Sequence, residues 1–413
     1  MSATPHQIAW NEARSLLAQA ERARESRDPA QLGGAVATTD SAIALLQRLA
    51  ATSDHPAPRR LLAAAWSLRA RLHAEANPSQ PNDETIRAYE AAVACLRQTP
   101  KDADLQVRAD LALALHQLGN ARQQRDAASD RRAALADYDE ALQVLGELPL
   151  ENAAGLQHVC GTVWLNRGAL CVRMNDPASP GEALRSFDAA IQALRSADAD
   201  STPSQRVNLA AAWMNRAHGL LRVREDVVNA QEARVAVREA LTHIRERERD
   251  NTLAADVGLK ARHIACRALG LLLAAPEIEA AAKSELSAEA LDLAEEGLDL
   301  ARHWLQRKAP MPLPFVHDLF RFGAQTYLTQ QPHFLAEFVL ENLDPETSVD
   351  ALPWHPALDA VATEAVTRAL QSLERPQFHV IDAPGTDRRI QSLHDLRRAA
   401  ERLQAIRTAA SAR

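Results

Sequence analysis

Aromatic residues make up only 4% of this 413-residue chain, although 46% of its residues are hydrophobic. The apolar content is therefore mostly Ala and Leu, which favour closely packed helices. Such a composition offers few of the residues that β-sheets prefer. We accordingly expect an all-α protein.

Cysteine is also scarce, with four residues at positions 95, 160, 171 and 266. No two of them form the Cys-x-x-Cys pair that would indicate a metal or redox site, and no regular histidine spacing accompanies them. We expect all four to lie inside helices as free thiols, where a cysteine acts as a small apolar residue. This pattern is typical of a reducing cytoplasm.

Long apolar runs and an excess of positive charge are absent as well. The longest apolar run, near residues 268–275, is too short for a transmembrane helix, which needs about 20 residues. The first residues do not show the basic-then-apolar pattern of a signal peptide. The formal net charge of −7 argues against a broad phosphate-binding surface. We expect a cytoplasmic protein that binds neither membranes nor nucleic acid.

Sequence motifs of enzymes are missing. The chain has no His-Glu-x-x-His and no Gly-x-Ser-x-Gly motif. Residues 380–385 resemble the metal-binding turn of GTPases, but no Gly-rich loop with a lysine accompanies them, so we interpret them as a turn. We expect no catalytic residue, no metal and no cofactor. A helical catalytic subunit is the least favoured class of function.

The chain does contain a register that returns every 49 residues. One series consists of large apolar residues: Trp66, Leu115, Trp164 and Trp213. Two further series keep the same interval, namely Tyr89, Tyr138 and Phe187, and Ala92, Ala141 and Ala190. A fixed period of this size is typical of stacked supersecondary units.

Each unit is predicted to contain two helices of roughly 20 residues joined by a short loop. Helix starts are marked by a hydroxyl residue, then Pro, then Glu or Gln, at residues 4–7, 179–182 and 202–205. Breaks are predicted at residues 77–81, Pro100, Pro149 and 175–177. The first helix of a pair carries the inward-facing Trp, and the second carries the aromatic residue and the alanine. Small residues should allow close helix contact at Ala92, Ala141, Ala190 and Ala240.

These residues resemble a tetratricopeptide repeat. The clearest copy combines Trp164-Leu165-Asn166-Arg167-Gly168 with Glu182-Ala183-Leu184 and Phe187-Asp188-Ala189-Ala190. A second copy combines residues 213–217 with Ala233, Val237 and Ala240. The resemblance implies a right-handed α-solenoid of stacked helical hairpins. Because tetratricopeptide units usually recur every 34 residues, the helices here are expected to be longer.

Three regions are predicted along the chain. Residues 1–56 form a degenerate N-terminal hairpin, residues 57–309 form five hairpins of the tetratricopeptide kind, and residues 310–413 form a helical C-terminal cap. Six of the seven Phe residues lie in the last region, where residues 377–381 could form one short strand. Residues 388–407 are predicted to be an amphipathic helix that docks on the body, with self-association as the alternative. Its apolar side is expected to carry Ile390, Leu393, Leu396, Leu403 and Ile406.

Helix geometry selects one polar surface opposite the Trp side of the first helices. Its candidate partner-binding residues are Gln117, Asn120, Gln124, Asn166, Arg173, Asn215, His218 and Arg222. The resemblance implies that first helices line a concave groove in which Asn and basic side chains hold peptides. The alternative is a solvated face whose Asn side chains bond a neighbouring helix. Four arginines near the Trp side are expected to pair with acids such as Asp139: Arg69, Arg167, Arg216 and Arg267.

The sequence therefore favours a non-enzymatic scaffold or adaptor that binds a segment of another protein along the concave face. The alternative is a regulatory sensor that binds a small ligand or a signalling peptide. The identity of the partner is left open by the sequence.

Overall fold

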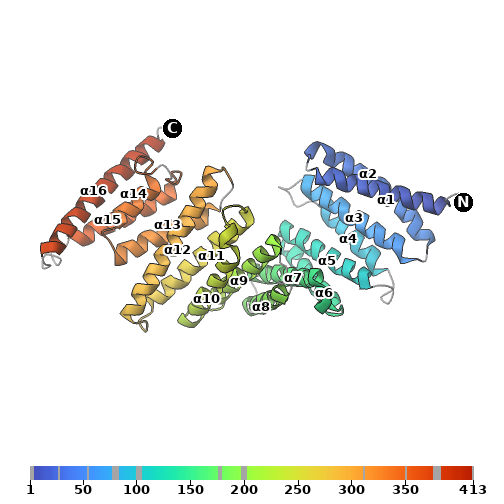
Figure 1. Cartoon of the computed structure of the whole chain (residues 1–413), viewed down its shortest axis with the longest axis horizontal. Helices are drawn as coiled ribbons and strands as arrows, with labels where there is room; N and C mark the ends of the chain where they lie inside the picture. Colours follow the sequence, from blue (N-terminus) through green and yellow to red (C-terminus); the bar gives the residue numbers. More distant parts are fainter. Residues whose placement is uncertain are drawn as a thin grey trace. The chain divides into compact units, whose positions relative to one another are not determined.

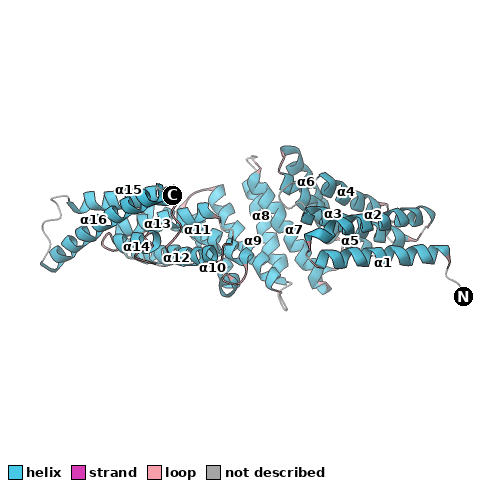
Figure 2. Cartoon of the chain, turned by 90° about the horizontal axis from the view of Figure 1, so that it is seen from above, coloured by secondary structure: helices cyan, strands magenta, loops and turns pink. Residues whose placement is uncertain are grey.

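The computed structural model describes residues 4–26, 28–53, 55–76, 83–98, 105–174, 179–196, 202–309, 312–348, 351–374 and 383–411. These residues form sixteen α-helices and two 3₁₀ helices, and they contain no strand (Figure 2). The expectation of an all-α fold is confirmed. The strand predicted at residues 377–381 lies outside the described residues. The chain divides into two compact units, residues 1–201 and 202–413.

The first unit consists of four helical pairs in sequence order (Figure 1). The first helices of the pairs are α1 (Pro5–Glu25), α3 (Pro56–Ala76), α5 (Leu105–Arg125) and α7 (Ala154–Arg173). The second helices are α2 (Pro29–Thr52), α4 (Asp83–Arg97), α6 (Ala128–Gly146) and α8 (Ser179–Ser196), with the 3₁₀ helix η1 (Leu150–Asn152) before α7. Every helix packs on the next one along the chain, and α5 also contacts α7. This unit is an α-solenoid of stacked hairpins.

The second unit begins with two more pairs, α9 (Pro203–Val223) with α10 (Val227–Ile244) and α11 (Thr252–Ala274) with α12 (Ala280–Gln306). The 3₁₀ helix η3 (Arg245–Arg247) separates them. Four helices follow: α13 (Leu313–Gln330), α14 (Leu335–Leu343), α15 (Pro356–Glu374) and α16 (Ala383–Ser411). The first helices α9, α11 and α13 contact one another in sequence, and α13 also packs on α15. None of the described helices has the length and apolar character needed to cross a bilayer.

Local sequence explains where the helices begin. Thr4 and Thr202 each form the predicted capping box, in which the hydroxyl accepts from the backbone and a Gln side chain reaches back. The first helices α3, α5, α7, α9 and α11 begin at Pro56, Leu105, Ala154, Pro203 and Thr252, so each starts 49 residues after the one before. The period in the sequence is thus the spacing of these helix starts.

Small residues accommodate the aromatic side chains of the second helices. Tyr138 and Phe187 are fully buried, as are the alanines of the repeat at positions 92, 141, 190 and 240. A Cβ atom added to Gly119 would lie 2.6 Å from the Tyr138 ring, and one added to Gly168 would lie 2.5 Å from Phe187. The first and second helices of a pair can therefore approach closely only because these positions carry no side chain.

The tryptophans are less buried than the sequence predicts. Leu115 is fully buried, but Trp66, Trp164 and Trp213 are only half-buried. In each case the arginine three residues later covers the ring. The distances from guanidinium carbon to ring centroid are 5.7 Å for Arg69 over Trp66, 5.7 Å for Arg167 over Trp164 and 6.0 Å for Arg216 over Trp213. An indole at the edge of the core keeps one face outside it, and a cation can stabilise that face.

These arginines also make the ion pairs that the sequence predicts. Arg167 Nε lies 2.7 Å from Asp139 on the preceding helix α6. The other pairs are Arg69 with Asp40 at 2.7 Å, Arg216 with Glu232 at 3.4 Å and Arg267 with Glu225 at 2.7 Å. The arginine series is therefore structural: three members pair with acids of neighbouring helices, and Arg267 pairs with an acid of the loop between α9 and α10.

The four cysteines are free, as expected. Cys171 and Cys266 are buried, whereas Cys95 and Cys160 are half-buried. Burial raises the pKa of all four thiols. They are therefore present as thiols at neutral pH and serve as packing residues.

A buried ion pair lies between α11, α12 and the loop before α11. Arg262 is 3% exposed and donates to both carboxylate oxygens of Glu248, at 2.6 and 3.0 Å. Its second partner, Glu296 on α12, lies at 3.2 Å. Burial lowers the pKa of Arg262, but the two carboxylates outweigh burial and the net pKa is raised. Gly258 leaves the space for this pair, because an added Cβ would lie 1.7 Å from a Glu248 oxygen.

The C-terminal helix α16 packs on α14 and α15, the two helices before it in the predicted C-terminal cap. Arg402 makes two hydrogen bonds to Asp344, at 2.7 and 2.9 Å, and Arg407 makes two to Asp359, at 2.7 and 3.1 Å. Leu396 and Leu403 are buried as expected. Ile390, which the sequence places on the apolar side, is 61% exposed.

Candidate functional site

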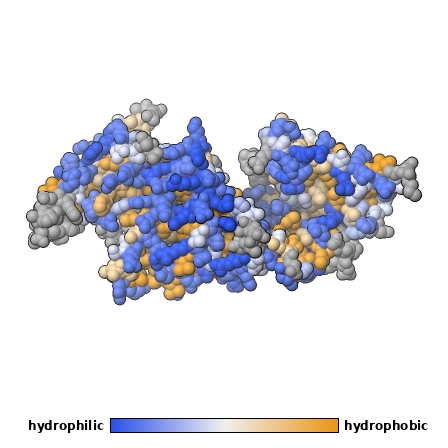
Figure 3. All heavy atoms as spheres, viewed as in Figure 1, coloured by the Kyte–Doolittle hydropathy of each residue, from blue (hydrophilic) through white to orange (hydrophobic). Residues whose placement is uncertain are grey.

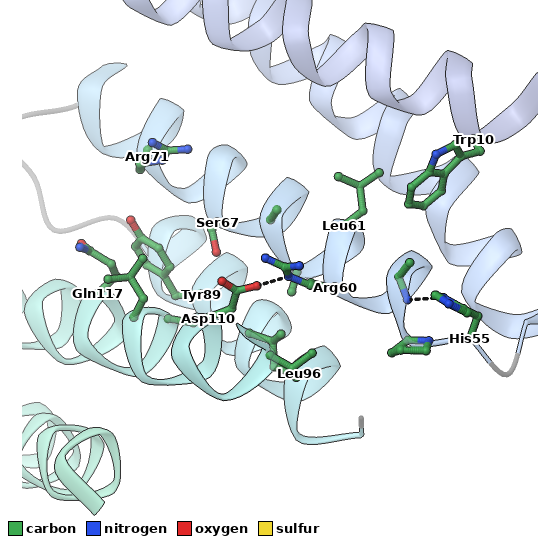
Figure 4. A pocket seen from close by; sticks show the side chains of 17 residues that line it. Trp10, His55, Arg60, Leu61, Ser67, Arg71, Tyr89, Leu96, Asp110 and Gln117 are labelled. Carbon is green, nitrogen blue, oxygen red and sulfur yellow. Dashed lines mark hydrogen bonds and ion pairs between the residues drawn. The ribbon is translucent and has the colours of Figure 1, made fainter. Parts of the chain in front are cut away.

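A pocket of about 700 Å³ lies in the first unit over the first helices α1, α3 and α5 (Figure 4). Its apolar wall comes from Trp10, Leu61, Leu96, Val107 and Leu113, together with alanines 57, 63, 64 and 114. The alanines on α3 and α5 make room, because their side chains end at Cβ. On the face shown in Figure 3, apolar patches lie among hydrophilic residues.

Polar groups stand along the same pocket, and α3 and α5 supply most of them. Arg60 on α3 forms an ion pair with Asp110 on α5, which bridges the two helices (Figure 4). Gln106 donates to the second oxygen of Asp110 at 3.0 Å, so each oxygen of this carboxylate accepts a hydrogen bond. The charge of Arg60 is therefore compensated within the protein.

The other end of the pocket contains Ser67, Arg71, Tyr89 and Gln117. Burial raises the pKa of Tyr89 to about 12, so the phenol is neutral at physiological pH and can donate a hydrogen bond. Arg71 lies 3.5 Å from Glu21, and this carboxylate also pairs with Arg24 at 2.8 Å. This end thus combines an apolar floor with several hydrogen-bonding groups.

Of the predicted groove residues, only Gln117 lines this pocket. Asn120 on α5 and Asn166 on α7 instead bond each other, with Asn166 Nδ2 donating to Asn120 Oδ1 at 2.8 Å. Asn166 Nδ2 also lies 3.1 Å from His116 Nε2, and the Tyr138 hydroxyl donates to Asn120 Oδ1 at 2.8 Å. These contacts are the interhelical bonding that the sequence left open as an alternative.

His116 takes part in this network although the sequence reasoning did not select it. Burial, with a smaller effect of His158, lowers the pKa of His116 to about 4. The imidazole is therefore neutral at pH 7 and its Nε2 can accept from both asparagines. Its position directly after Leu115, which belongs to the 49-residue series, was the available signal.

The remaining residues predicted in the first unit lie at the ends of α5 and α7. Gln124 is exposed. Arg173 lies 3.5 Å from Asp126, and its backbone carbonyl accepts from Arg131 at 3.1 Å. Neither residue belongs to the pocket lining.

In the second unit, Asn215, His218 and Arg222 lie on α9. His218 is half-buried, and its pKa is lowered by burial and then by Arg267, Arg222 and His263. Cationic groups of α9 and α11 are therefore close enough to influence one another.

A smaller hollow of about 360 Å³ lies over α11 and α13 in this unit. Its lining includes His263, Arg267, Asp318 and Arg321. Asp318 lies 3.6 Å from His263 and 3.4 Å from Arg321. The α13 residues were not predicted, because the C-terminal segment breaks the 49-residue pattern. In the described ranges, no group of three or more His, Cys, Asp and Glu side chains could hold a metal ion.

Comparisons with known proteins give little further information. No protein-family model matches the chain, and no curated protein matches it. Among solved structures, it is similar to a protein described as "Circular tandem repeat protein with novel repeat topology and enhanced subunit contact surfaces". The two share 12% sequence identity, the match covers 97% of this chain and 99% of that one, and the TM-score is 0.32. A likeness at this level has no bearing on function.

Proposed function

We propose that this chain is a non-enzymatic, cytoplasmic scaffold or adaptor of the tetratricopeptide kind, which binds a segment of another protein along its first helices. The observation that carries the proposal is the pocket over α1, α3 and α5. It combines an apolar wall with polar groups at one end. Such a combination is typical of sites that anchor an apolar side chain and orient it by a few hydrogen bonds.

The predicted groove residues take different parts in this proposal. Gln117 contacts the partner directly at the pocket. Asn120 and Asn166 hold α5 against α7 beside it. Asn215, His218 and Arg222 form a second contact face on α9. Gln124 on α5 and Arg173 on α7 occupy the position of the 49-residue repeat that Arg222 has on α9. Self-association through α16 is not part of the proposal, because that helix is docked.

Site-specific photo-crosslinking tests the proposal. Peptides selected from a displayed random library on the full-length protein are used as ligands. A photoreactive residue is placed at Gln117 on α5, at Arg222 on α9 or, as control, at the exposed Ala94 on the second helix α4. We expect crosslinks at position 117 or 222 and none at position 94. Failure to select any ligand, or crosslinking only at position 94, would contradict the proposal.

The alternative is a sensor that binds a small ligand. The pocket volume favours it, since sites for small molecules commonly measure 300–1,000 Å³ and this one has about 700 Å³. A compound that raises the melting temperature of the protein, and does so less in a variant with Ala64→Trp, would support this function.

A further inference from the structure

Two successive intervals, the gaps between neighbouring first helices of the first unit, have side chains at the same four positions of the 49-residue repeat. The side chains fill one gap and leave the other open. One interval lies between α3 and α5, and the next lies between α5 and α7. The residues 49 positions apart are Ser67 and His116, Arg71 and Asn120, Tyr89 and Tyr138, and Gln117 and Asn166.

The second interval is closed by its own side chains. Asn166 reaches from α7 to Asn120 at 2.8 Å and to His116 at 3.1 Å, both on α5. Tyr138 donates to Asn120 at 2.8 Å. The polar groups of this set bond one another across the two helices.

The first interval is open. All four of its residues line the 700 Å³ pocket, and Figure 4 shows them around one end of it. Among the described residues, no hydrogen bond joins Ser67, Tyr89 and Gln117 to one another. Serine is much shorter than histidine, so it does not reach across the gap that His116 helps to close. Ser67, Tyr89 and Gln117 are therefore available to a ligand, and Arg71 lies 3.5 Å from Glu21.

The open interval has the form of a slot along two helices. Arg60, Ala64, Ser67 and Arg71 follow one another at helical spacing on α3, and Asp110, Ala114 and Gln117 do so on α5. The α3 residues cover three turns, or about 16 Å at 1.5 Å per residue. A slot of this length between two helices matches the i, i+4, i+7 face of a third helix.

We propose that this slot binds an amphipathic helix of a partner protein, whose apolar face packs on the alanine-lined wall. This inference rests on the proposed scaffold function and assigns the chemistry of its ligand. Large apolar side chains of the partner contact Leu61, Leu96 and Leu113. A carboxylate on its flank accepts from Arg71, because Glu21 is already held more closely by Arg24 than by Arg71.

Direct binding to model peptides provides the test. The probes are fluorescein-labelled helical peptides with Leu, Met or Phe at positions i, i+4, i+7 and i+11 and Glu or Gln at the flanks. Scrambled peptides of the same composition are the controls. Anisotropy with the full-length protein should show binding by at least one helical peptide, about tenfold tighter than by its scrambled form. Equal binding of both forms, or none, would overturn the proposal.

A pair of variants locates the binding. Ala64→Trp fills the slot at an exposed alanine, and Ala37→Trp adds the same indole at an exposed position on α2 outside the pocket. We expect Ala64→Trp to weaken the helical peptide about tenfold or more, as loss of a central anchor does. Ala37→Trp should leave affinity within about twofold. Equal affinity of the two variants would refute the assignment to the slot.

A triple variant tests the register argument itself and does not depend on the folding of the Trp variant. Ser67→His, Arg71→Asn and Gln117→Asn copy the second interval into the first. We expect the affinity for the helical peptide to fall about tenfold, while the helix content stays the same and the melting temperature is unchanged or higher. In parallel, Arg71→Gln should weaken Glu-flanked peptides more than Gln-flanked ones. Undiminished binding by the triple variant would contradict the proposal.

Failure of this inference can be distinguished from failure of the scaffold function. If library-selected ligands crosslink at position 117 or 222 but no designed helix binds, the scaffold remains and the helical partner is excluded. The dye anilinonaphthalene sulfonate tests the remaining outcome. If the wild type binds the dye, the Ala64→Trp variant does not, and no helical peptide displaces it, the slot binds small apolar molecules instead.

Discussion

Two buried clusters of polar groups, one in each unit of this protein, are built in different ways. In the first unit, His116, Asn120 and Asn166 form a network of neutral groups between α5 and α7. In the second unit, Arg262 and Glu248 form a charged pair that is almost completely buried. A neutral network costs less desolvation than a buried charge and loses less when one member is removed, because a buried charge depends on its partner. Helical repeats can therefore be held together by either chemistry, with different responses to mutation and pH.

The largest expected effect is that of Glu248→Ala. Removing this carboxylate leaves Arg262 buried with only the more exposed Glu296. We expect the free energy of unfolding to fall by about 3–5 kcal/mol. Urea denaturation monitored by circular dichroism measures it. The double variant Arg262→Met with Glu248→Leu should recover most of the loss, since two apolar residues need no partner. If the double variant is as unstable as the single one, buried charge is not the cause.

The neutral network predicts a response to acid. The pKa of His116 is lowered to about 4 by burial, below its ordinary value of 6.5. The unfolded chain therefore binds a proton at this histidine more readily than the folded chain does. The free energy of unfolding keeps its full value above pH 6.5 and falls as the pH decreases toward 4. Between pH 7 and pH 5 the loss amounts to about 2 kcal/mol for this group.

The measurement is urea denaturation of the wild type and of His116→Gln at both pH values. Because other histidines titrate in the same range, the difference between the two proteins isolates His116. The wild type should lose about 2 kcal/mol more than the variant on acidification. An equal loss in both proteins would show that His116 titrates normally in the folded state.

A smaller effect is expected for Asn166→Ala. This change removes the donor to Asn120 and His116, and we expect a loss of about 1 kcal/mol. Gln124→Ala, at an exposed position of α5, is the matched control and should stay within about 0.5 kcal/mol of the wild type. Should Asn166→Ala instead leave stability unchanged and reduce ligand binding, Asn166 is a contact residue of the groove.

The smallest expected effect is that of Glu296→Ala. The Glu296 side chain is 40% exposed, and Arg262 keeps both bonds to Glu248 without it. Stability should therefore fall by less than about 1 kcal/mol. A loss as large as that of Glu248→Ala would mean that the three residues act as one unit.

Particular residues show how far sequence reasoning reached. The capping boxes at Thr4 and Thr202 and the buried alanines at positions 92, 141, 190 and 240 were predictable, because they depend on contacts within a helix or within one hairpin. Trp66, Trp164 and Trp213 were misjudged, since hydrophobic spacing does not reveal that an arginine one turn later covers the ring. The size of a side chain alone did not determine its burial.

The candidate site was less predictable for a related reason. Gln117 and Asn166 occupy the same register position, and the sequence treats them alike. Gln117 lines a pocket, whereas Asn166 bonds to His116 across the corresponding gap, because the first gap has the short Ser67 at the position that His116 occupies in the second. A pattern along one helix contains no information about which neighbours lie across it.

The sequence by itself determined the helical class, the helix starts, the 49-residue spacing and the small residues at the closest helix contacts. These features depend on backbone propensity, capping and packing between chain neighbours, all of which are local. The tertiary structure alone decided which polar residues bond each other, which acid each arginine pairs with and where a pocket stays open. Those outcomes depend on distances between side chains from different hairpins, which the pattern along one helix does not contain.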